Sequence, residues 1–598
     1  MPNSVPRLSK AILVLCLVTV APISASAEAI PVEVKRTGES WQLLRGGKPY
    51  YVKGAGGDGS KKLLVECGGN SFRTWGVDDK TQAQLDEAHR LGLTVTVGMW
   101  LGHERHGFNY SSLDQVIAQT KAVRDAVLKF KDHPTVLCWA IGNEMEGEGH
   151  NAAVWSHIEL LAAMVKRLDP HHPTMTVIAE IGGRKVEAIH KLCPSLDLVG
   201  INSYGGVQSI PERYRKAGGT KPYLVTEYGP NGVWETPKNN LGTVDELSST
   251  SKASDYRKAY AALSADRKLC LGSYAFTWGH KQETTATWFG LLLPDGSRLA
   301  GVDELSALWS GTARKNLCPK ISSLRLNAYR GKAGSNIKAS LKCADSERDP
   351  LKVRWVLMED SQEFVTGGDF QVTPPEVPKS IVKSLLTGAD IRLPEYGGLY
   401  RLYVYVTDPH GGAATASAPI LVDGPRRFRK GSKASLPLLI AGEAGEKERY
   451  ASSGYMGNAA AIVMDPKCQD DPHSGKTCLK VTYKANDGWG GVVWQSPAND
   501  WGDVAGGLDL TGAKQLRFFA RGADGGEKVK FGFGIIGRDK KYYDTTKSEQ
   551  EFTLTSKWKE YSFELKDRDL SRIKTGFTWA LASSGKPVVF YLDDVKFE

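Results

Sequence analysis

The sequence has few cysteines and lacks the cysteine spacings that hold metals. Nine cysteines occur in 598 residues, with no Cys-x-x-Cys pair and no His/Cys ligand pattern. So few cysteines in so long a chain do not form a disulfide scaffold, and nothing indicates a zinc site. Cys468 and Cys478 are close in sequence and flank a turn-rich Asp-Pro segment, so we predict that they form a disulfide.

The sequence also lacks a strong excess of one charge. Lys and Arg number 77 against 67 Asp and Glu, and the two signs are mixed along the chain. Nucleic acid is therefore not a predicted partner. Hydrophobic residues make up 41% and charged residues 24%, as in ordinary globular proteins, which argues against disorder, collagen and coiled coil. At roughly 100–200 residues per domain, the length predicts three to five domains.

Long hydrophobic runs are missing except at the N-terminus. Arg7 and Lys10 precede an apolar run over residues 11–21, and the small-residue pattern Ala25-Ser26-Ala27 follows. This order predicts a cleaved secretory signal over residues 1–27, because the run is too short for a stable membrane span. We therefore expect an exported protein, extracellular or periplasmic, with no membrane segment after cleavage.

Residues 28–313 alternate strand-length apolar runs with helical patterns. The eight runs are 51–54, 71–75, 94–98, 136–142, 174–178, 196–201, 223–226 and 271–276. Eight alternating strand–helix units in about 280 residues predict a (β/α)₈ TIM barrel. The predicted architecture is multidomain, with this barrel followed by an immunoglobulin-like β-sandwich and a galactose-binding-like β jelly roll.

The rest of the chain is strand-rich. Residues 318–422 show period-2 strands with Asp-Pro and Gly-Gly turns and resemble an immunoglobulin-like or cadherin-like sandwich, which we interpret as a spacer. Residues 423–435 include a basic stretch that is typical of a solvated linker. Residues 436–598 form the last predicted β domain.

Two of the eight runs end in a glutamate, Glu144 after the fourth and Glu227 in the seventh. Catalytic groups of a TIM barrel lie at the C-terminal ends of its strands. A lone glutamate there is more often a solvated residue, but two in one barrel mouth supply the acid and the nucleophile that glycoside hydrolysis needs. Other polar or aromatic residues at these ends are Arg73, His103, His106, Asn202, Tyr204 and Trp278.

Residues 129–144 resemble the acid/base segment of glycoside hydrolase clan A, especially the family 2 catalytic barrels. Residues 70–75, 167–170, 201–204 and 226–229 fall in the clan's order as well. The resemblance covers residues 45–310 and implies a retaining β-glycosidase with carboxyls about 5–5.5 Å apart.

The resemblance also implies a role for individual residues. Glu144 is the expected acid/base, and Asn143 the expected partner of the sugar 2-hydroxyl. Glu227 is the expected nucleophile, held by Arg73 and Tyr204. Trp278 is the expected floor of the subsite. From their places after the strands, Asn202 and His103 are further candidate substrate-site residues, and for His103 and His106 a loop histidine without function is an equal alternative.

Two departures from family 2 bear on the substrate. The barrel follows the predicted signal almost directly, without the two β domains that precede a family 2 barrel, which disfavours exo-acting galactosidase or glucuronidase activity. Residues 51–54 and 226–229 also resemble β-1,3-glucan-active enzymes, so a β-glucan is slightly favoured. Glu146 and Glu148 are interpreted as solvated acids rather than substrate-loop residues.

The C-terminal ending over residues 590–597, with 558–563 before it, resembles carbohydrate-binding jelly rolls. Such modules stack aromatic rings on sugars. The candidates are Trp489, Trp494, Trp501, Tyr542, Tyr543 and Trp579. The predicted chemistry requires no metal or organic cofactor, and the C-terminal module leaves room for a structural cation.

Two alternatives to hydrolysis stay open. One is a β-glucan transglycosylase, in which an acceptor sugar replaces water. The other is a non-catalytic glycan-binding protein built on a TIM-barrel platform. All three predict a polysaccharide or oligosaccharide partner, and fold alone does not separate them.

Overall fold

The computed structural model describes residues 28–106, 108–361, 371, 373–425, 431–442, 449–537, 539–583 and 585–598. The predicted signal over residues 1–27 lies outside this part of the chain. The protein divides into two compact units, Met1–Pro425 and Arg426–Glu598. None of the described helices is both long and apolar enough to cross a membrane.

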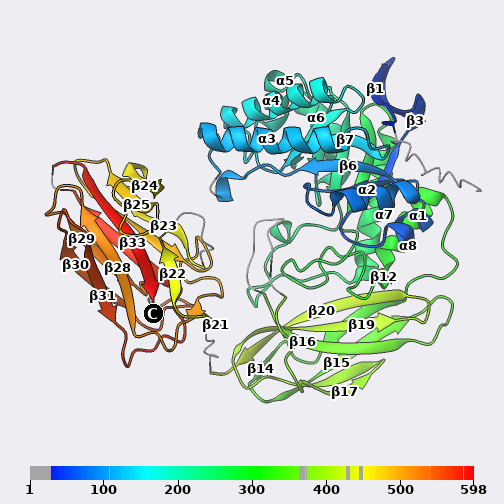
Figure 1. Ribbon diagram of the computed structural model, residues 1–598. Coiled ribbons are helices and arrows are strands. Elements are labelled where there is room, and N and C mark those ends of the chain that lie inside the picture. The colour runs from blue at the N-terminus through cyan, green and yellow to red at the C-terminus, as the bar shows by residue number, and fades with distance from the viewer. Residues whose placement is uncertain are drawn as a thin grey trace, which may run out of the picture. The chain divides into compact units, whose positions relative to one another are not determined.

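The first unit contains the predicted TIM barrel (Figure 1). Its strands close in the order β10-β11-β4-β5-β6-β7-β8-β9, which confirms the barrel and all eight predicted runs. Their bounds are β4 Val52–Gly56, β5 Ser71–Arg73, β6 Thr94–Met99, β7 Val136–Asn143, β8 Thr174–Ala179, β9 Leu198–Asn202, β10 Tyr223–Tyr228 and β11 Cys270–Phe276.

Helices cover the outside of the barrel because each one presents an apolar stripe to the strands. In the fourth helix, Val154, Ile158, Leu161 and Val165 are buried, and the Asn151 side chain caps its first turn. The helices are α1 Lys61–Glu66, α2 Thr81–Arg90, α3 Leu113–Phe130, α4 Ala152–Leu168, α5 Lys185–Leu192, α6 Ile210–Lys216, α7 Ser249–Ala265 and α8 Ala300–Ser310, with 3-10 turns η1 Glu104–His106, η2 Val207–Ser209 and η3 Val233–Glu235.

A small antiparallel sheet closes the N-terminal end of the barrel. It consists of β1 Val32–Thr37, β2 Ser40–Arg45 and β3 Lys48–Tyr50. Leu43 is buried in one cluster with the barrel residues Leu137 and Leu271. Because this end is filled with apolar side chains, only the opposite, C-terminal end is left open for chemistry.

The middle sandwich, residues 318–423, consists of two facing sheets around a core that includes Trp355, Ile391 and Leu402. One sheet runs β12-β20-β19-β16, with β14 beside β20, and the other runs β13-β15-β18-β17. The bounds are β12 Arg298–Leu299, β13 Lys320–Leu326, β14 Arg330–Lys332, β15 Asn336–Ala344, β16 Lys352–Glu359, β17 Ile381–Leu385, β18 Gly388–Arg392, β19 Gly398–Thr407 and β20 Gly412–Asp423.

The middle sandwich packs directly against the barrel, and its role as a spacer stays a prediction. Strand β12, which directly precedes the barrel helix α8, pairs in parallel with β20 of the sandwich. Barrel loops also bond to the sandwich, as between the Thr243 hydroxyl and Asp360 (2.8 Å). Figure 1 shows β12 and α8 directly beside β20. Period-2 strand patterns identify a sandwich but not what its outer face contacts, so the sequence missed this packing.

The second unit is a separate two-sheet β domain with its own core, including Phe518, Phe531 and Phe577. Its sheets run β24-β25-β33-β28-β31, with β22 beside β33, and β23-β26-β32-β29-β30. The bounds are β21 Ser432–Lys433, β22 Leu438–Ala441, β23 Ala451–Gly457, β24 Ile462–Cys468, β25 Cys478–Tyr483, β26 Trp489–Gln495, β27 Leu508–Asp509, β28 Gln515–Gly522, β29 Lys528–Phe533, β30 Ser548–Thr553, β31 Lys559–Glu564, β32 Thr575–Ala582 and β33 Val588–Phe597, with a 3-10 turn η4 Ala459–Ala461. We call residues 436–598 the C-terminal module.

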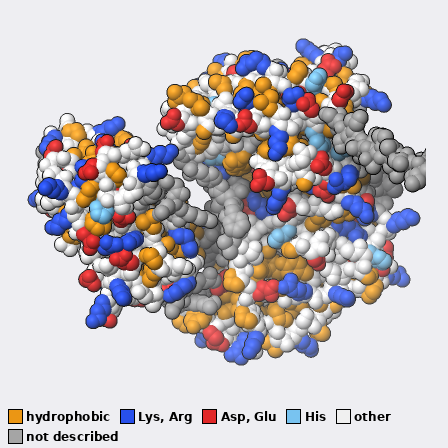
Figure 2. Space-filling view, in the orientation of Figure 1, with side chains coloured by type: hydrophobic (Ala, Val, Ile, Leu, Met, Phe, Trp, Pro, Cys, Tyr) orange, Lys and Arg blue, Asp and Glu red, His pale blue; other side chains and the backbone are white. Residues whose placement is uncertain are grey.

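Surface charge follows the sequence expectation. On the face that Figure 2 shows, Lys and Arg side chains are interspersed with Asp and Glu over both units. Cys468 and Cys478 lie directly opposite each other as buried thiols on β24 and β25. Their predicted disulfide therefore has the right register, and its formation stays a prediction.

Candidate active site

A cavity of about 420 Å³ lies at the C-terminal ends of the barrel strands and contains both predicted carboxyls. This volume is typical of a small-molecule site. Glu144 follows β7 and Glu227 lies near the end of β10. The lining residues are Gly57, Asp58, Trp75, Trp100, Arg105, Asn143, Glu144, Tyr204, Glu227, Trp234, Phe276, Thr277, His280, Lys281 and Glu283.

Glu227 accepts hydrogen bonds on both carboxylate oxygens. Arg73 Nη1 and Trp75 Nε1 donate to Oε1, each at 2.8 Å, and the Tyr204 hydroxyl donates to Oε2 at 2.7 Å. Burial and the neighbouring carboxylates raise the pKa of Tyr204, so its hydroxyl stays protonated and able to donate. One buried guanidinium and two further donors therefore fix the position of this carboxyl in the cavity.

Glu144 lies in a different environment. Asn202 Nδ2 donates to its Oε1 at 2.7 Å. Burial, and next the negative charge of Glu227, raise the pKa of Glu144 to about 7, whereas the Asn202 bond acts in the other direction. Glu227 accepts three hydrogen bonds, whereas the buried Glu144 has a raised pKa, and two neighbouring carboxyls in such different environments are the pattern of an acid and a nucleophile.

Asn143 connects the two carboxyl environments. Its Oδ1 accepts from Arg73 Nη2 at 2.6 Å and from Asn202 Nδ2 at 3.2 Å. Thr226 in turn donates to Asn202 Oδ1 at 2.7 Å. The bonds from Arg73 and Asn202 both end on the Asn143 oxygen, and Asn143 itself lines the cavity.

Four of the predicted site residues do not line the cavity: Arg73, Asn202, Trp278 and His103. Arg73 and Asn202 lie buried beside it and hydrogen-bond the two carboxyls. Trp278 is fully buried, and its Nε1 donates to the Ser60 carbonyl at 2.9 Å, so it cannot form the floor of a subsite. His103 is buried behind Trp100, with the two rings stacked at 4.9 Å. The side chain of His106 lies outside the described part of the chain.

Several aromatic residues that the sequence did not single out line the cavity instead. Trp75, Trp100, Trp234 and Phe276 all do so. Trp100 and Trp234 are 47% and 55% exposed, as a platform for a sugar ring requires. Their position just after strands β6 and β10 was the available signal, because loops at this end of a barrel build the site.

Glu146 is not the solvated acid that the sequence suggested. It is 5% exposed, and its Oε1 accepts from the Ala179 backbone N–H at 2.8 Å and faces Lys185 Nζ at 3.3 Å. The carboxyl thus holds strand β8 and helix α5 together. Glu148 is exposed, in agreement with the expectation.

The cavity wall carries mixed charge away from the two carboxyls. Lys281 Nζ pairs with Glu283 at 2.5 Å, and Arg105 and Asp58 also line the wall. Burial lowers the pKa of His280, so this imidazole is neutral at pH 7. The wall therefore offers both cationic and anionic groups to a polar ligand.

The aromatic candidates of the C-terminal module fall into two groups. Trp489 and Trp501 are exposed, at 49% and 36%, and Tyr542 is half-buried. Trp494 and Trp579 are buried in the core, where Trp494 packs edge-on against Phe577 at 5.6 Å. These two cannot stack on a glycan, which corrects the prediction for Trp494.

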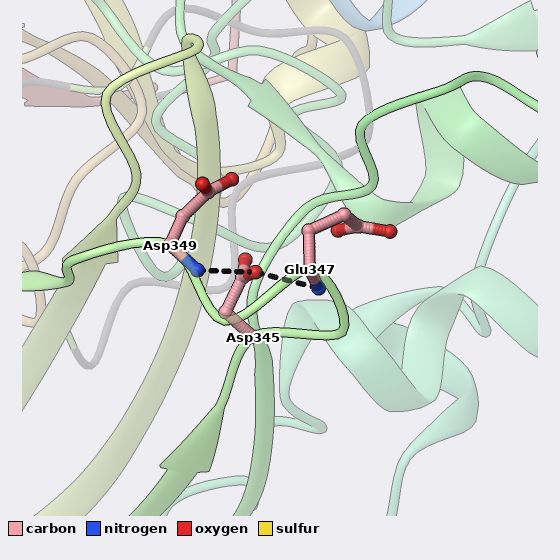
Figure 3. Close-up of side chains that lie close together, drawn as sticks. All are labelled: Asp345, Glu347 and Asp349. Atoms are coloured by element: carbon pink, nitrogen blue, oxygen red, sulfur yellow. Dashed lines mark hydrogen bonds between the residues drawn. The ribbon is translucent and has the colours of Figure 1, made fainter.

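One acidic cluster, Asp345, Glu347 and Asp349, lies in the β15–β16 loop of the middle sandwich (Figure 3). Asp345 Oδ1 accepts from the backbone N–H groups of Glu347 and Asp349, at 2.9 and 3.0 Å. Asn316 Nδ2 donates to Asp349 at 2.6 Å. These hydrogen bonds explain the cluster as part of a turn. The structural cation considered for the C-terminal module is a separate matter and stays a prediction.

Comparison with known proteins adds a family to this geometry. Residues 83–261 match the model of the glycosyl hydrolases family 2, TIM barrel domain. A β-glucuronidase of Streptococcus agalactiae serotype V is 24% identical over 245 residues, which cover 33% of this chain and 40% of that protein. The β-glucuronidase of Sus scrofa is 26% identical over 227 residues, covering 32% of each. The match thus spans less than half the length of either relative.

Similar solved structures are also named β-glucuronidases, at lower sequence identity. A β-D-glucuronidase of Dictyoglomus thermophilum has 18% identity and a TM-score of 0.38, covering 47% of this chain and 54% of that one. Bacteroides uniformis β-glucuronidase 2 has 12% identity and a TM-score of 0.37, covering 94% and 67%. The matched segment, which carries Glu144 and Glu227, is thus similar to the glycosyl hydrolases family 2, TIM barrel domain.

Proposed function

We propose that this protein is a retaining β-glycosidase that cleaves a β-glycosidic bond by double displacement. One observation carries the proposal: a single cavity holds two carboxyls in contrasting environments. Glu227 accepts three hydrogen bonds, including one from a buried guanidinium, whereas the pKa of Glu144 is raised to about 7. The first suits a nucleophile and the second an acid that is still protonated near neutral pH.

In the first step, a Glu227 oxygen bonds to the anomeric carbon while the glycosidic bond breaks. The Glu144 carboxyl gives its proton to the leaving oxygen and becomes ionised. In the second step, Glu144 takes a proton from a water molecule, whose oxygen bonds to the anomeric carbon as the bond to Glu227 breaks. Two inversions retain the configuration. The Asn143 amide nitrogen is the proposed donor to the sugar 2-hydroxyl.

The test compares the wild type with Glu144→Gln and Glu227→Gln on aryl β-glycosides. Either variant should lose activity by several orders of magnitude. A 2-deoxy-2-fluoroglycoside should add its sugar mass to wild type and not to Glu227→Gln. Glu148→Gln is the matched control, because this exposed glutamate lies on the same loop and should leave the kinetics unchanged. Retained activity in Glu227→Gln would contradict the proposal.

Two substrate classes compete at this site. The motifs over residues 51–54 and 226–229 favour a β-glucan. A β-glucuronide is the second candidate, because Arg105 and Lys281 line the cavity and could pair with a sugar carboxylate, and because the similar proteins are named β-glucuronidases. Aryl β-D-glucuronide, aryl β-D-glucoside and a β-1,3-glucan, assayed side by side, separate these classes.

The same assay separates hydrolysis from its alternatives. Products longer than the substrate would indicate transglycosylation, since an acceptor sugar then replaces water in the second step. Binding of a glycan without any cleavage would favour the binding-platform alternative. The double displacement itself calls for no metal or organic cofactor.

The C-terminal module and the N-terminus complete the proposal. Two exposed tryptophans, Trp489 and Trp501, support glycan binding by the module, which would hold polymer near the barrel. Affinity electrophoresis of the whole chain in polysaccharide gels tests this role. The predicted signal supports export, and N-terminal sequencing of the mature protein should find a start after Ala27.

A further inference from the structure

Two long loops of the barrel form one wall of the cavity. The first follows β10 and carries Trp234, and the second follows β11 and carries Thr277, His280, Lys281 and Glu283, all of which line the cavity. Long loops inside a compact domain are usually functional. The contacts that fix these two loops therefore bear on the shape of the cavity.

A buried ion pair of the middle sandwich forms hydrogen bonds with the first loop. Arg401 on β19 bonds to Asp360 through Nε and Nη2, both at 3.0 Å, and neither side chain is exposed. The same Nη2 donates to the Val244 carbonyl of the loop at 2.8 Å. Thr243 of the loop donates to Asp360 Oδ2 at 2.8 Å. A planar guanidinium is suited to bonding a carboxylate and a carbonyl at once.

A second buried group ties the two loops to each other. Glu246 of the first loop accepts from Lys252 Nζ at 2.5 Å and from the Thr287 hydroxyl of the second loop at 2.7 Å. Ser417 on β20 donates to the other Glu246 oxygen at 2.8 Å. The second loop also donates from Ala286 N to the Tyr403 hydroxyl of the sandwich at 3.4 Å.

Apolar packing connects the loop that Arg401 contacts to the catalytic carboxyl of Glu227. Val244, whose carbonyl Arg401 holds, is fully buried in a cluster with Tyr204, Phe276, Val233, Trp288 and Phe289. Tyr204 donates to Glu227, and its ring lies edge-on to Trp234 at 5.4 Å. Close-packed groups transmit displacement, so the Val244 position bears on both Tyr204 and Trp234.

We propose that Arg401 of the middle sandwich is a positioning residue for the substrate cavity, acting through Val244 on Tyr204 and Trp234. The middle sandwich then helps to set the shape of the active site. The kinetic readout rests on the proposed glycosidase function, whereas the loop itself can be followed without any activity.

The test variant is Arg401→Lys, which keeps a cation opposite Asp360 but offers a point charge in place of the two-sided guanidinium. We expect kcat/KM on an aryl β-glycoside to fall about tenfold, with most of the change in KM. Thr243→Val, which removes the loop's own bond to Asp360, should change KM in the same direction. Arg330→Lys is the matched control, because Arg330 makes an exposed two-bond pair with Asp423 on the same domain.

Hydrogen–deuterium exchange separates positioning from a loss of folding. In folded Arg401→Lys, peptides over residues 232–248 should exchange faster, while the sandwich strands β15 and β18 keep wild-type protection. Uniformly faster exchange in the sandwich with unchanged kinetics of the folded enzyme would overturn the proposal, as would wild-type exchange over residues 232–248. If wild type cleaves nothing, the glycosidase proposal fails, and the exchange result still decides the role of Arg401 in holding the loop.

Discussion

The middle sandwich and the C-terminal module are both two-sheet β domains, yet they use buried polar side chains differently. In the middle sandwich, Arg401 donates a hydrogen bond to the Val244 carbonyl of a barrel loop. In the C-terminal module, the buried carboxyl of Asp544 accepts from Ile536 N and the Thr575 hydroxyl, both within the module. Where a buried polar group finds its partner thus distinguishes an integrated domain from an independent one.

The comparison extends to the aromatic residues. The middle sandwich buries Trp355 in its core, whereas the C-terminal module exposes Trp489 and Trp501. The exposed tryptophans offer the C-terminal module a surface for a ligand. The middle domain instead commits part of its surface to supporting the cavity wall.

The largest expected difference between the two domains is in stability. Arg401→Ala leaves the Asp360 carboxylate buried without its cation, which should cost the Met1–Pro425 unit about 3–5 kcal/mol. The C-terminal module should keep its stability. Urea unfolding followed by hydrogen exchange of peptides from each unit measures both, and an equal loss in the two units would contradict the comparison. The exposed pair provides the control, since Arg330→Ala should change stability by less than about 0.5 kcal/mol.

A disulfide between Cys468 and Cys478 should strengthen only the C-terminal module. Cross-strand partners have the Cα separation that a disulfide needs, and closing this short loop is worth about 3 kcal/mol. Intact mass before and after a reductant, with Cys468→Ser as the control, detects the bond. If the reductant lowers the stability of the barrel unit instead, the two domains are not independent.

Activity and glycan binding should respond differently to pH. Glu144 must carry a proton to act as an acid, and its pKa is about 7, so kcat/KM should fall about tenfold per pH unit above this value. Binding by stacked tryptophans involves no titrating group and should stay constant from about pH 6 to about pH 9. Kinetics and affinity electrophoresis, measured over the same pH range, check this. If glycan binding weakened above pH 7 together with kcat/KM, the barrel and the module would not act separately.

The smallest expected effect is that of removing one exposed tryptophan from the C-terminal module. Trp489→Ala should weaken glycan retention by about 0.5–1.5 kcal/mol, because one stacking platform is lost, and should leave stability nearly unchanged. Trp494→Ala should instead destabilise the module by about 3–5 kcal/mol, because it empties a core position. Equal glycan retention in wild type and Trp489→Ala would remove Trp489 from the proposed site.

The barrel and its two carboxyls could be predicted from the sequence because both depend on patterns between residues that are close along the chain. Alternating strand and helix periods define eight units, and a residue at the end of a parallel strand must lie at the open end of the barrel. Glu144, Glu227, Arg73 and Tyr204 therefore could be named before any coordinates. Cavity-lining aromatics such as Trp75 and Trp234 were not singled out, because a position near a strand end marks a candidate but does not show which loop side chains turn into the cavity.

By itself, the sequence determined the barrel, the two sandwiches and the strand-end carboxyls, since these depend on spacing along the chain. Tertiary structure alone decided that Trp278 and Trp494 are buried while Trp234 and Trp489 are exposed, and that Arg401 reaches a barrel loop. Burial and hydrogen bonding depend on groups more than a hundred residues away, as the Arg401–Val244 bond shows. No local pattern carries that information, so the role of the middle sandwich emerged only from the folded chain.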